Sequence, residues 1–337
     1  MSSDSTRDKL PPYLPRGLLG NAHVQSLLTS GPLRRRRVQR AASDYLSRSE
    51  REVHEADDGT RLLGFRNVAI ESGRRNALVI LLHGWEGSSE SNYLLAAARS
   101  LDAAGFDTFR LNFRDHGPSH HLNLELFHSC RLQEVLDVVR NLRRDYTEGP
   151  VFLVGFSLGG NFALRVARSA PGAGFALDQV IAVSPVIRPH HVLDALEDGL
   201  AIYHAYFVRK WRNSLRTKQA LYPEHFRLDE WFRLKKLRSQ TDWLVRNMTE
   251  FPDLNAYLEG YSVAGDYLAD LTTPTLIITA EDDPIIPVTD FHALPRPDAL
   301  RIELLDKGGH CGFLENWRLE SWIEKRLIDE LCPLTRN

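Results

Sequence analysis

One serine of the chain lies in a segment whose residue types suit nucleophilic catalysis. The apolar run 151–154 has the length of a strand, and Gly155-Phe156-Ser157-Leu158-Gly159 follows it before a helical pattern. Glycines on both sides of Ser157 leave room for a sharp strand-to-helix turn that exposes the hydroxyl at the end of the strand. Leu158 then opens the helix, where unpaired backbone amides stabilise a developing oxyanion. The segment predicts a nucleophilic serine, although such turns also use glycine for packing alone.

A second glycine-rich segment offers another donor for an oxyanion. The continuous apolar run 77–82 indicates a strand buried on both faces, and it ends at His83-Gly84-Trp85-Glu86-Gly87. The backbone amide of Trp85 is the candidate donor. A β-to-α turn without any chemistry is the alternative for this segment taken by itself.

A base and an acid follow later in the chain. A strand pattern at 274–279 precedes Asp282 and Asp283. Another at 299–305 precedes His310. An aspartate beyond the end of a strand can hold one nitrogen of an imidazole, which leaves the other nitrogen free to take the serine proton. Glycines on both sides of His310 let the backbone return over the sheet edge. We therefore predict that Ser157, His310 and one of the two aspartates form a catalytic triad.

Several segments resemble one family more closely than a shared fold requires. The candidate triad residues occur along the chain in the order serine, acid, histidine, which is the order in α/β-hydrolases. The segments are similar to the YheT-like, embryogenesis-associated branch, and the likeness runs from about residue 12 to the C-terminus. The segments are Gly20-Asn21-Ala22-His23-Val24-Gln25-Ser26, His83-Gly84-Trp85-Glu86-Gly87-Ser88, Leu111-Asn112-Phe113-Arg114, Phe127-His128-Ser129 and Gly155-Phe156-Ser157-Leu158-Gly159-Gly160-Asn161.

The resemblance implies a function and assigns site residues. It implies a serine esterase that cleaves carboxylic esters with an apolar acyl group, or lipid-like esters, through an acyl-enzyme intermediate. Asp283 is favoured as the acid because Asp283-x-x-Ile286-Pro287 resembles the turn that follows the acid in these hydrolases, while Asp282 is a capping or solvated neighbour. The amides of Trp85 and Leu158 are expected to form the oxyanion hole.

The chain also departs from this family. Ser26 stands where threonine is usual, and Cys130 stands where glycine often follows His128-Ser129. Asp115–His121 replaces the usual Gly-Cys-Ser-Gly. The last change alters a loop near the expected active-site mouth, so the substrate of better-known members does not carry over. The alternatives are an acyltransferase with the same triad, a hydrolase of amide or peptide bonds, and a non-catalytic binding protein on a hydrolase scaffold.

The histidines of this loop raise the question of a metal. His116, His120, His121 and His128, with Asp115, are residue types that suit zinc or another divalent ion. Their spacing matches no ligand motif, and hydrogen bonding within the loop or simple exposure is the preferred interpretation. Because triad chemistry needs no cofactor, we expect neither a metal nor an organic cofactor.

Composition limits the partners of the chain. A net charge of −2 over 337 residues gives no general attraction to nucleic acid, and we interpret Arg34–Arg37 as a solvated stretch or as surface ion pairs. The odd number of cysteines, Cys130, Cys311 and Cys332, fits a reducing compartment. No run of eighteen apolar residues and no leader pattern is present. We expect a cytoplasmic protein without stable membrane insertion that acts on a small-molecule ester or lipid. Its oligomeric state is not indicated.

Alternating strand and helix patterns predict an α/β fold with a mostly parallel central sheet flanked by helices. The strands 51–56 and 61–70 flank a hairpin turn at Asp57-Asp58-Gly59-Thr60, and a helix is predicted over 128–145. Residues 1–50 are expected to form an irregular extension that wraps the core. The core itself is assigned to 51–187 and 263–337, and the aromatic-rich segment 188–262 to a helical cap.

Overall fold

The computed structural model describes residues 10–70 and 73–335, and these form a sheet of eight strands with helices on both faces. The strand order is β1-β2-β4-β3-β5-β6-β7-β8. The strands are β1 (Glu50–Glu55), β2 (Arg61–Asn67), β3 (Leu78–Leu82), β4 (Asp107–Leu111), β5 (Val151–Phe156), β6 (Gln179–Val183), β7 (Thr275–Ala280) and β8 (Leu300–Leu305).

The sheet is parallel except at its β1 edge. β1 pairs antiparallel with β2, and β2 pairs antiparallel with β4, whereas the strands from β4 to β8 run parallel. Residues 57–60 form the predicted turn between β1 and β2. Because parallel strands end at the same edge, the loops after β3, β5, β7 and β8 all open on one side of the molecule. The predicted fold class, a mostly parallel sheet flanked by helices, is confirmed.

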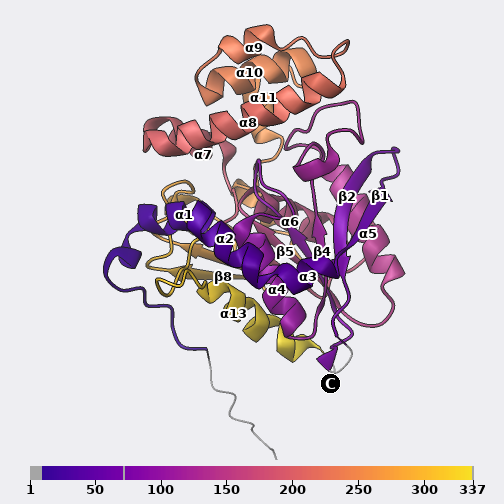
Figure 1. The fold of residues 1–337 in the computed structure, drawn as a ribbon, viewed down its shortest axis with the longest axis vertical. Helices are drawn as coiled ribbons and strands as arrows, with labels where there is room; N and C mark the ends of the chain where they lie inside the picture. The colour runs from indigo at the N-terminus through magenta and orange to yellow at the C-terminus, as the bar shows by residue number, and fades with distance from the viewer. Residues whose placement is uncertain (1–9, 71–72, 336–337) are drawn as a thin grey trace, which may run out of the picture.

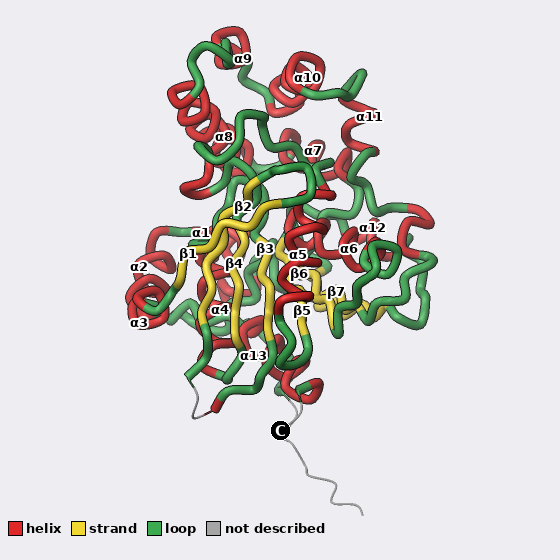
Figure 2. Tube along the Cα trace, turned by 90° about the vertical axis from the view of Figure 1, so that its right-hand side faces the viewer, coloured by secondary structure: helices red, strands yellow, loops and turns green. Residues whose placement is uncertain are grey.

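Side-chain alternation along the strands divides the core into two layers. Leu78, Ile80 and Leu82 of β3 pack against one group of helices, and Val79 and Leu81 pack against the other. All five are fully buried, which explains why the strand reads as a continuous apolar run. Figure 2 shows α1 to α4 on one side of the sheet and α5 and α6 on the other.

The remaining helices connect the strands or extend the core. Those outside the segment between β6 and β7 are α1 (Ala22–Ser30), α2 (Pro32–Ala41), α3 (Ser43–Ser47), α4 (Asn92–Ala103), α5 (Leu132–Asp145), α6 (Leu158–Ser169), α12 (Val288–His292) and α13 (Trp322–Leu331). Short 3₁₀ turns occur at Gly17–Gly20, Gly117–Ser119, Gly265–Leu268 and Cys332–Leu334. The predicted helix over 128–145 begins only at Leu132, so His128 and Ser129 lie in the preceding loop.

The segment between β6 and β7 folds into the helices α7 to α11. Figure 1 shows them above the strand ends, where the sequence predicts a cap. They are α7 (Pro189–Asp198), α8 (Ala201–Leu221), α9 (Asp229–Arg233), α10 (Leu237–Met248) and α11 (Leu254–Glu259). Trp211 and Trp231 pack edge to face, with ring centroids 5.1 Å apart, so aromatic side chains form much of the interior of this layer. None of the helices in the described parts of the chain combines the length and the apolarity that crossing a membrane requires.

The N-terminal segment differs from its prediction. The described part of residues 1–50 is largely helical, not irregular, because α1, α2 and α3 pack in sequence along the core. Arg34 was expected at the surface, but it is 1% exposed and donates to Glu324 of α13 at 3.0 Å. The basic run therefore contains one buried arginine that joins the N-terminal segment to the last helix, while Arg35 and Arg36 are exposed.

Gln25 of α1 fastens this segment to the C-terminal part of the chain. Its side chain is fully buried. The amide nitrogen is 2.8 Å from the Tyr13 hydroxyl and lies within hydrogen-bond distance of the carbonyl oxygens of Leu19 and Leu314. Its amide oxygen accepts from the N–H of Leu314 at 2.7 Å. One side chain thus forms hydrogen bonds with backbone groups that are almost 300 positions apart in the sequence.

Replacing Gln25 should destabilise the whole protein. Gln25→Ala leaves several buried polar groups without partners, each at a cost of about 1–3 kcal/mol, so we expect the free energy of unfolding to fall by about 2–4 kcal/mol. Urea unfolding followed by circular dichroism measures this loss. Gln39→Ala is the control, because Gln39 is only partly buried on α2, and it should change the value by less than about 0.5 kcal/mol. Equal free energies of unfolding for Gln25→Ala and Gln39→Ala would contradict the anchoring role of Gln25.

Candidate active site

Ser157 lies in the turn between β5 and α6, in a backbone conformation that few side chains adopt. Its φ is 55° and its ψ is −118°. A Cβ atom at Gly155 would lie 2.1 Å from the carbonyl oxygen of Gly159, and one at Gly159 would lie 2.4 Å from that of Leu82. The two glycines are therefore required by backbone contact, as the sequence predicts. The turn holds the Ser157 hydroxyl at the sheet edge.

The loops after β7 and β8 bring an imidazole and a carboxylate to this hydroxyl. His310 Nε2 is 2.9 Å from Ser157 Oγ, and His310 Nδ1 is 2.9 Å from Asp283 Oδ2. The other carboxylate oxygen of Asp283 accepts from the backbone amides of Ile285 and Ile286, at 2.9 and 3.0 Å. Serine, histidine and aspartate form one hydrogen-bonded row, in the order that base catalysis requires.

Asp282 has a different set of contacts. Its Oδ1 accepts from the backbone N–H of Gly309 at 2.9 Å, so it supports the loop of His310 without reaching the imidazole. Burial raises the pKa of Asp282, an effect that the Gly309 amide opposes. Of the two candidate acids, Asp283 is the one that the fold places beside His310.

The electrostatics around His310 favour its charged form. Burial is the largest single effect and lowers the pKa of the imidazole, but the charge and hydrogen bond of Asp283, together with the Cys311 side chain, outweigh it and raise this pKa well above its ordinary value of 6.5. The side chain of Asp283 is itself fully buried, which strengthens the attraction between the two groups. A proton taken from Ser157 would thus be held firmly on His310.

Two backbone amides beside Ser157 lack acceptors. Leu158 is the first residue of α6, and Trp85 is in the loop after β3; neither amide donates to another described residue. Both residues line the same cavity as Ser157. The positive end of the α6 dipole adds to the attraction for an anion at this point. The arrangement suits the predicted oxyanion hole.

His83 lies next to this loop but is unsuited to act as a base. Burial lowers its pKa to about 3, so its ring is neutral near pH 7. Its Nδ1 lies 2.8 Å from the carbonyl oxygen of Gly84, and its Nε2 accepts from the N–H of Phe113 at 3.2 Å. Tyr93 also holds the loop, because its hydroxyl accepts from the N–H of Gly84 at 2.8 Å. These side chains fix both backbone groups of Gly84, immediately before Trp85.

Ser26 contacts the candidate triad in a way that the sequence did not indicate. Its hydroxyl accepts from the backbone N–H of His310 at 2.8 Å and donates to the carbonyl oxygen of Ala22 at the same distance. The family-like segment around Ser26 was visible in the sequence, but its partner is 284 positions away. Only the resemblance of that segment pointed to importance, and it assigned no role to Ser26.

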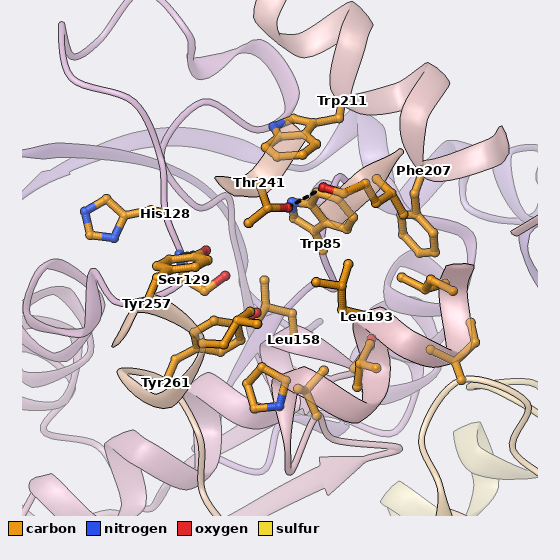
Figure 3. Close-up of a pocket in the computed structure, with 18 of the residues that line it drawn as sticks. Trp85, His128, Ser129, Leu158, Leu193, Phe207, Trp211, Thr241, Tyr257 and Tyr261 are labelled. Atoms are coloured by element: carbon orange, nitrogen blue, oxygen red, sulfur yellow. Dashed lines mark hydrogen bonds between the residues drawn. The ribbon is translucent and has the colours of Figure 1, made fainter. Parts of the chain in front are cut away.

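An apolar cavity of about 100 Å³ opens beside Ser157, beneath the helices of the cap segment. Figure 3 shows Trp85, Phe207 and Leu193 on one side of it and Tyr257 and Tyr261 on the other. The rings of Trp85 and Phe207 stack with centroids 5.2 Å apart. Polar groups are few in this lining, and include His128, Ser129 and Thr241. The cavity suits a narrow hydrocarbon chain.

The histidine-rich loop, Asp115–His121, contacts α8 and does not contact the row of Ser157, His310 and Asp283. Asp115 accepts from Lys218 of α8 at 2.7 Å, and His120 pairs with Ser214 at 2.9 Å. His116 contacts backbone groups of Arg114 and Glu86. Across residues 10–70 and 73–335, no three histidine, cysteine, aspartate or glutamate side chains are grouped so as to hold a metal ion. The loop instead joins the core to α8.

The chain is similar to known proteins over nearly its whole length. The chain is 28% identical to "Putative esterase YheT" of Escherichia coli (strain K12), over 95% of this chain and 92% of that protein. It is 24% identical to the embryogenesis-associated protein EMB8 of Picea glauca, over 97% of this chain and 73% of that protein. The predicted resemblance to YheT-like proteins is confirmed.

Solved structures and a family model agree on the fold. The Pyrococcus furiosus esterase Pf2001 superimposes with a TM-score of 0.56 at 16% identity, covering 88% of this chain and 96% of that one. The model of the alpha/beta hydrolase fold family matches residues 77–316. This match spans more than half of the chain and includes every residue of the Ser157, Asp283 and His310 row. The protein belongs to the α/β-hydrolase fold family.

Proposed function

We propose that the protein is a serine hydrolase that cleaves carboxylic esters with an apolar acyl group through an acyl-enzyme. One observation carries this proposal: the hydrogen-bonded row of Ser157, His310 and Asp283 opens onto an apolar cavity. The similarity to the protein named "Putative esterase YheT" supports the same reaction class.

In the first step, Ser157 Oγ attacks the ester carbonyl carbon while His310 Nε2 takes the hydroxyl proton. The carbonyl oxygen becomes an oxyanion that accepts from the amides of Trp85 and Leu158. Each such donor is worth about 2.7–4 kcal/mol in the transition state. Asp283 stabilises the imidazolium and stays ionised.

Collapse of the tetrahedral intermediate breaks the bond to the alcohol oxygen. His310 Nε2 returns its proton to that oxygen, so the alcohol leaves neutral and the acyl group stays on Ser157. Water then attacks the acyl carbon, with His310 as base, and the carboxylic acid is released as the Ser157 proton is restored. No step requires a cofactor.

The cavity supports an apolar acyl group as the preferred substrate feature. While the acyl group is bound to Ser157, it must lie in the space that Ser157 lines, and the walls there are mostly aliphatic and aromatic. A charged acyl chain would lose its hydration without gaining a partner. Short or medium hydrocarbon chains fit this narrow space best.

A fluorophosphonate probe should label one residue. Attack by an activated serine adds one probe to the wild type, and intact mass spectrometry detects the adduct. We expect no adduct on Ser157→Ala. Ser169→Ala, at the opposite end of α6, is the matched control and should label at the wild-type rate. Labelling of folded Ser157→Ala would place the nucleophile elsewhere and overturn the proposal.

Hydrolysis should increase with pH through the pKa of His310. The imidazole must be neutral to accept the serine proton, so kcat/KM is low below this pKa and rises above it. Since Asp283 raises the pKa, the midpoint should lie above the ordinary histidine value of 6.5. Asp283→Asn should shift the midpoint to lower pH and reduce kcat by about 10³–10⁴-fold. Rates on a short-chain aryl ester between pH 5 and 10 measure both effects.

Asp282→Asn is the matched control for that profile. The asparagine keeps an oxygen that accepts from the Gly309 amide, so the loop of His310 is retained. Its profile should keep the wild-type midpoint, with kcat reduced by less than about tenfold. Equal losses in the two variants would defeat the assignment of Asp283 as the acid.

A further inference from the structure

A second cavity reaches His310 from the opposite side of Phe207. It has a volume of about 530 Å³ and lies between the N-terminal helices and the first turns of α8. Phe207, Ile285 and His310 line both this cavity and the one beside Ser157. Ser157, Trp85 and Leu158 line only the first. The two spaces therefore meet at the imidazole.

The walls of the second cavity combine hydrocarbon with hydroxyl groups. Leu27 and Pro32 face it from the N-terminal helices, and Ile202 faces it from α8. The hydroxyls of Ser26, Tyr203 and Tyr206 and the guanidinium of Arg209 add polar character. Leu27 and Ile202 are 38% and 51% exposed, so the outer end opens to solvent.

The reaction assigns different parts of an ester to the two spaces. The acyl group is bonded to Ser157 in the intermediate, so it must occupy the cavity that Ser157 lines. The alcohol oxygen must instead receive a proton from His310 Nε2 as the bond breaks. A space that touches His310, but neither Ser157 nor the oxyanion donors, can hold the alcohol and cannot hold the acyl group.

We infer that the cavity between α1, α2 and α8 is the leaving-group site, and that it takes an amphiphilic alcohol of several carbon atoms. This inference rests on the proposed esterase function. A volume of about 530 Å³ is much larger than methanol or ethanol fills, and it is within the range of small-molecule sites. The preferred substrate thus joins a narrow acyl chain to a bulkier alcohol that has an apolar body and polar groups.

The N-terminal segment is essential to this site. Ser26 contacts the backbone of His310, and His23 Nδ1 lies 3.0 Å from the hydroxyl of Tyr203 on α8. Helix α1 consequently touches the base on one side and the cap segment on the other. Without α1 and the start of α2, the second cavity would have no outer wall.

Filling the cavity should change selectivity for the alcohol alone. Ala205 lines the space from the exposed face of α8, so Ala205→Trp adds bulk there with little cost to folding. With butanoate held constant as the acyl group, we expect kcat/KM for the hexyl and phenylpropyl esters to fall at least tenfold. The value for the methyl ester should stay within about twofold of the wild type.

Two further variants make the test specific. Ala220→Trp adds the same side chain near the far end of α8, where neither of these two cavities has a lining residue, and it should leave kcat/KM for all three esters unchanged. Val192→Phe narrows only the cavity beside Ser157. It should reduce kcat/KM for methyl octanoate relative to methyl butanoate, without discriminating between the alcohols of butanoate esters.

The outcomes separate this inference from the proposed function. If Ala205→Trp lowers kcat/KM equally for the methyl, hexyl and phenylpropyl esters, or behaves like Ala220→Trp, the leaving-group assignment is overturned while ester hydrolysis stands. If the wild type cleaves no ester and takes no fluorophosphonate, the esterase proposal fails, and the leaving-group site fails with it. A loss confined to the large alcohols supports both.

Discussion

Backbone crowding at the turn between β5 and α6 is the constraint around which the site is built. A residue at φ 55° and ψ −118° is strained by about 1–3 kcal/mol, yet Ser157 has little freedom to relax. Its N–H donates to the carbonyl oxygen of Val183 at 2.9 Å, and its own carbonyl oxygen accepts from Asn161 at 3.0 Å. Strand β6 and helix α6 thereby hold both backbone groups of Ser157. The hydroxyl position follows from the sheet and is independent of any substrate.

The position of His310 depends on contacts from distant parts of the chain. Asp283 holds one ring nitrogen, Asp282 holds the preceding backbone amide, and Ser26 accepts from the backbone of His310 itself. Gln25 secures Leu314 a few residues later. The loop is thus supported on one side by the end of β7 and on the other by α1. A helix near the N-terminus is as much a part of the imidazole's environment as the strand beside it.

Local sequence patterns predict those features that depend on local geometry. The strand ends and the glycines around Ser157 could be recognised, because each depends on residues within about ten positions. The order of serine, acid and histidine could be recognised because each of the three lies in such a local motif, although the motifs themselves are far apart in the chain. The roles of Ser26 and Arg34 could not, because their partners, His310 and Glu324, are almost 300 positions away. The sequence gives little indication of the N-terminal helices, because α2 is so rich in arginine that it shows little apolar character. Tertiary contacts, among them the buried Arg34 to Glu324 pair, support it in place of an apolar face.

The loop that departs most from the family also helps to hold α8, the helix that carries Phe207 between the two cavities. Burial raises the pKa of Asp115 and lowers the pKa of Lys218. Lys218 Nζ lies 2.7 Å from Asp115 Oδ1, and the attraction between the two charges opposes both shifts. Breaking such a buried pair costs about 3–5 kcal/mol, since one charge is left unpaired. Lys218 also donates to the carbonyl oxygen of Asn123, so the loop holds α8 near its C-terminal end.

Two other contacts hold the same helix elsewhere. Lys210 donates to the carbonyl oxygen of Glu86, beside the oxyanion loop, and Tyr203 contacts His23 near the start of α8. Phe207 lies between these two anchors and therefore has a defined position between the cavities. The loop Asp115–His121 lines neither cavity, so its contribution to their walls is indirect and is made through the contacts that fix α8, which carries Phe207.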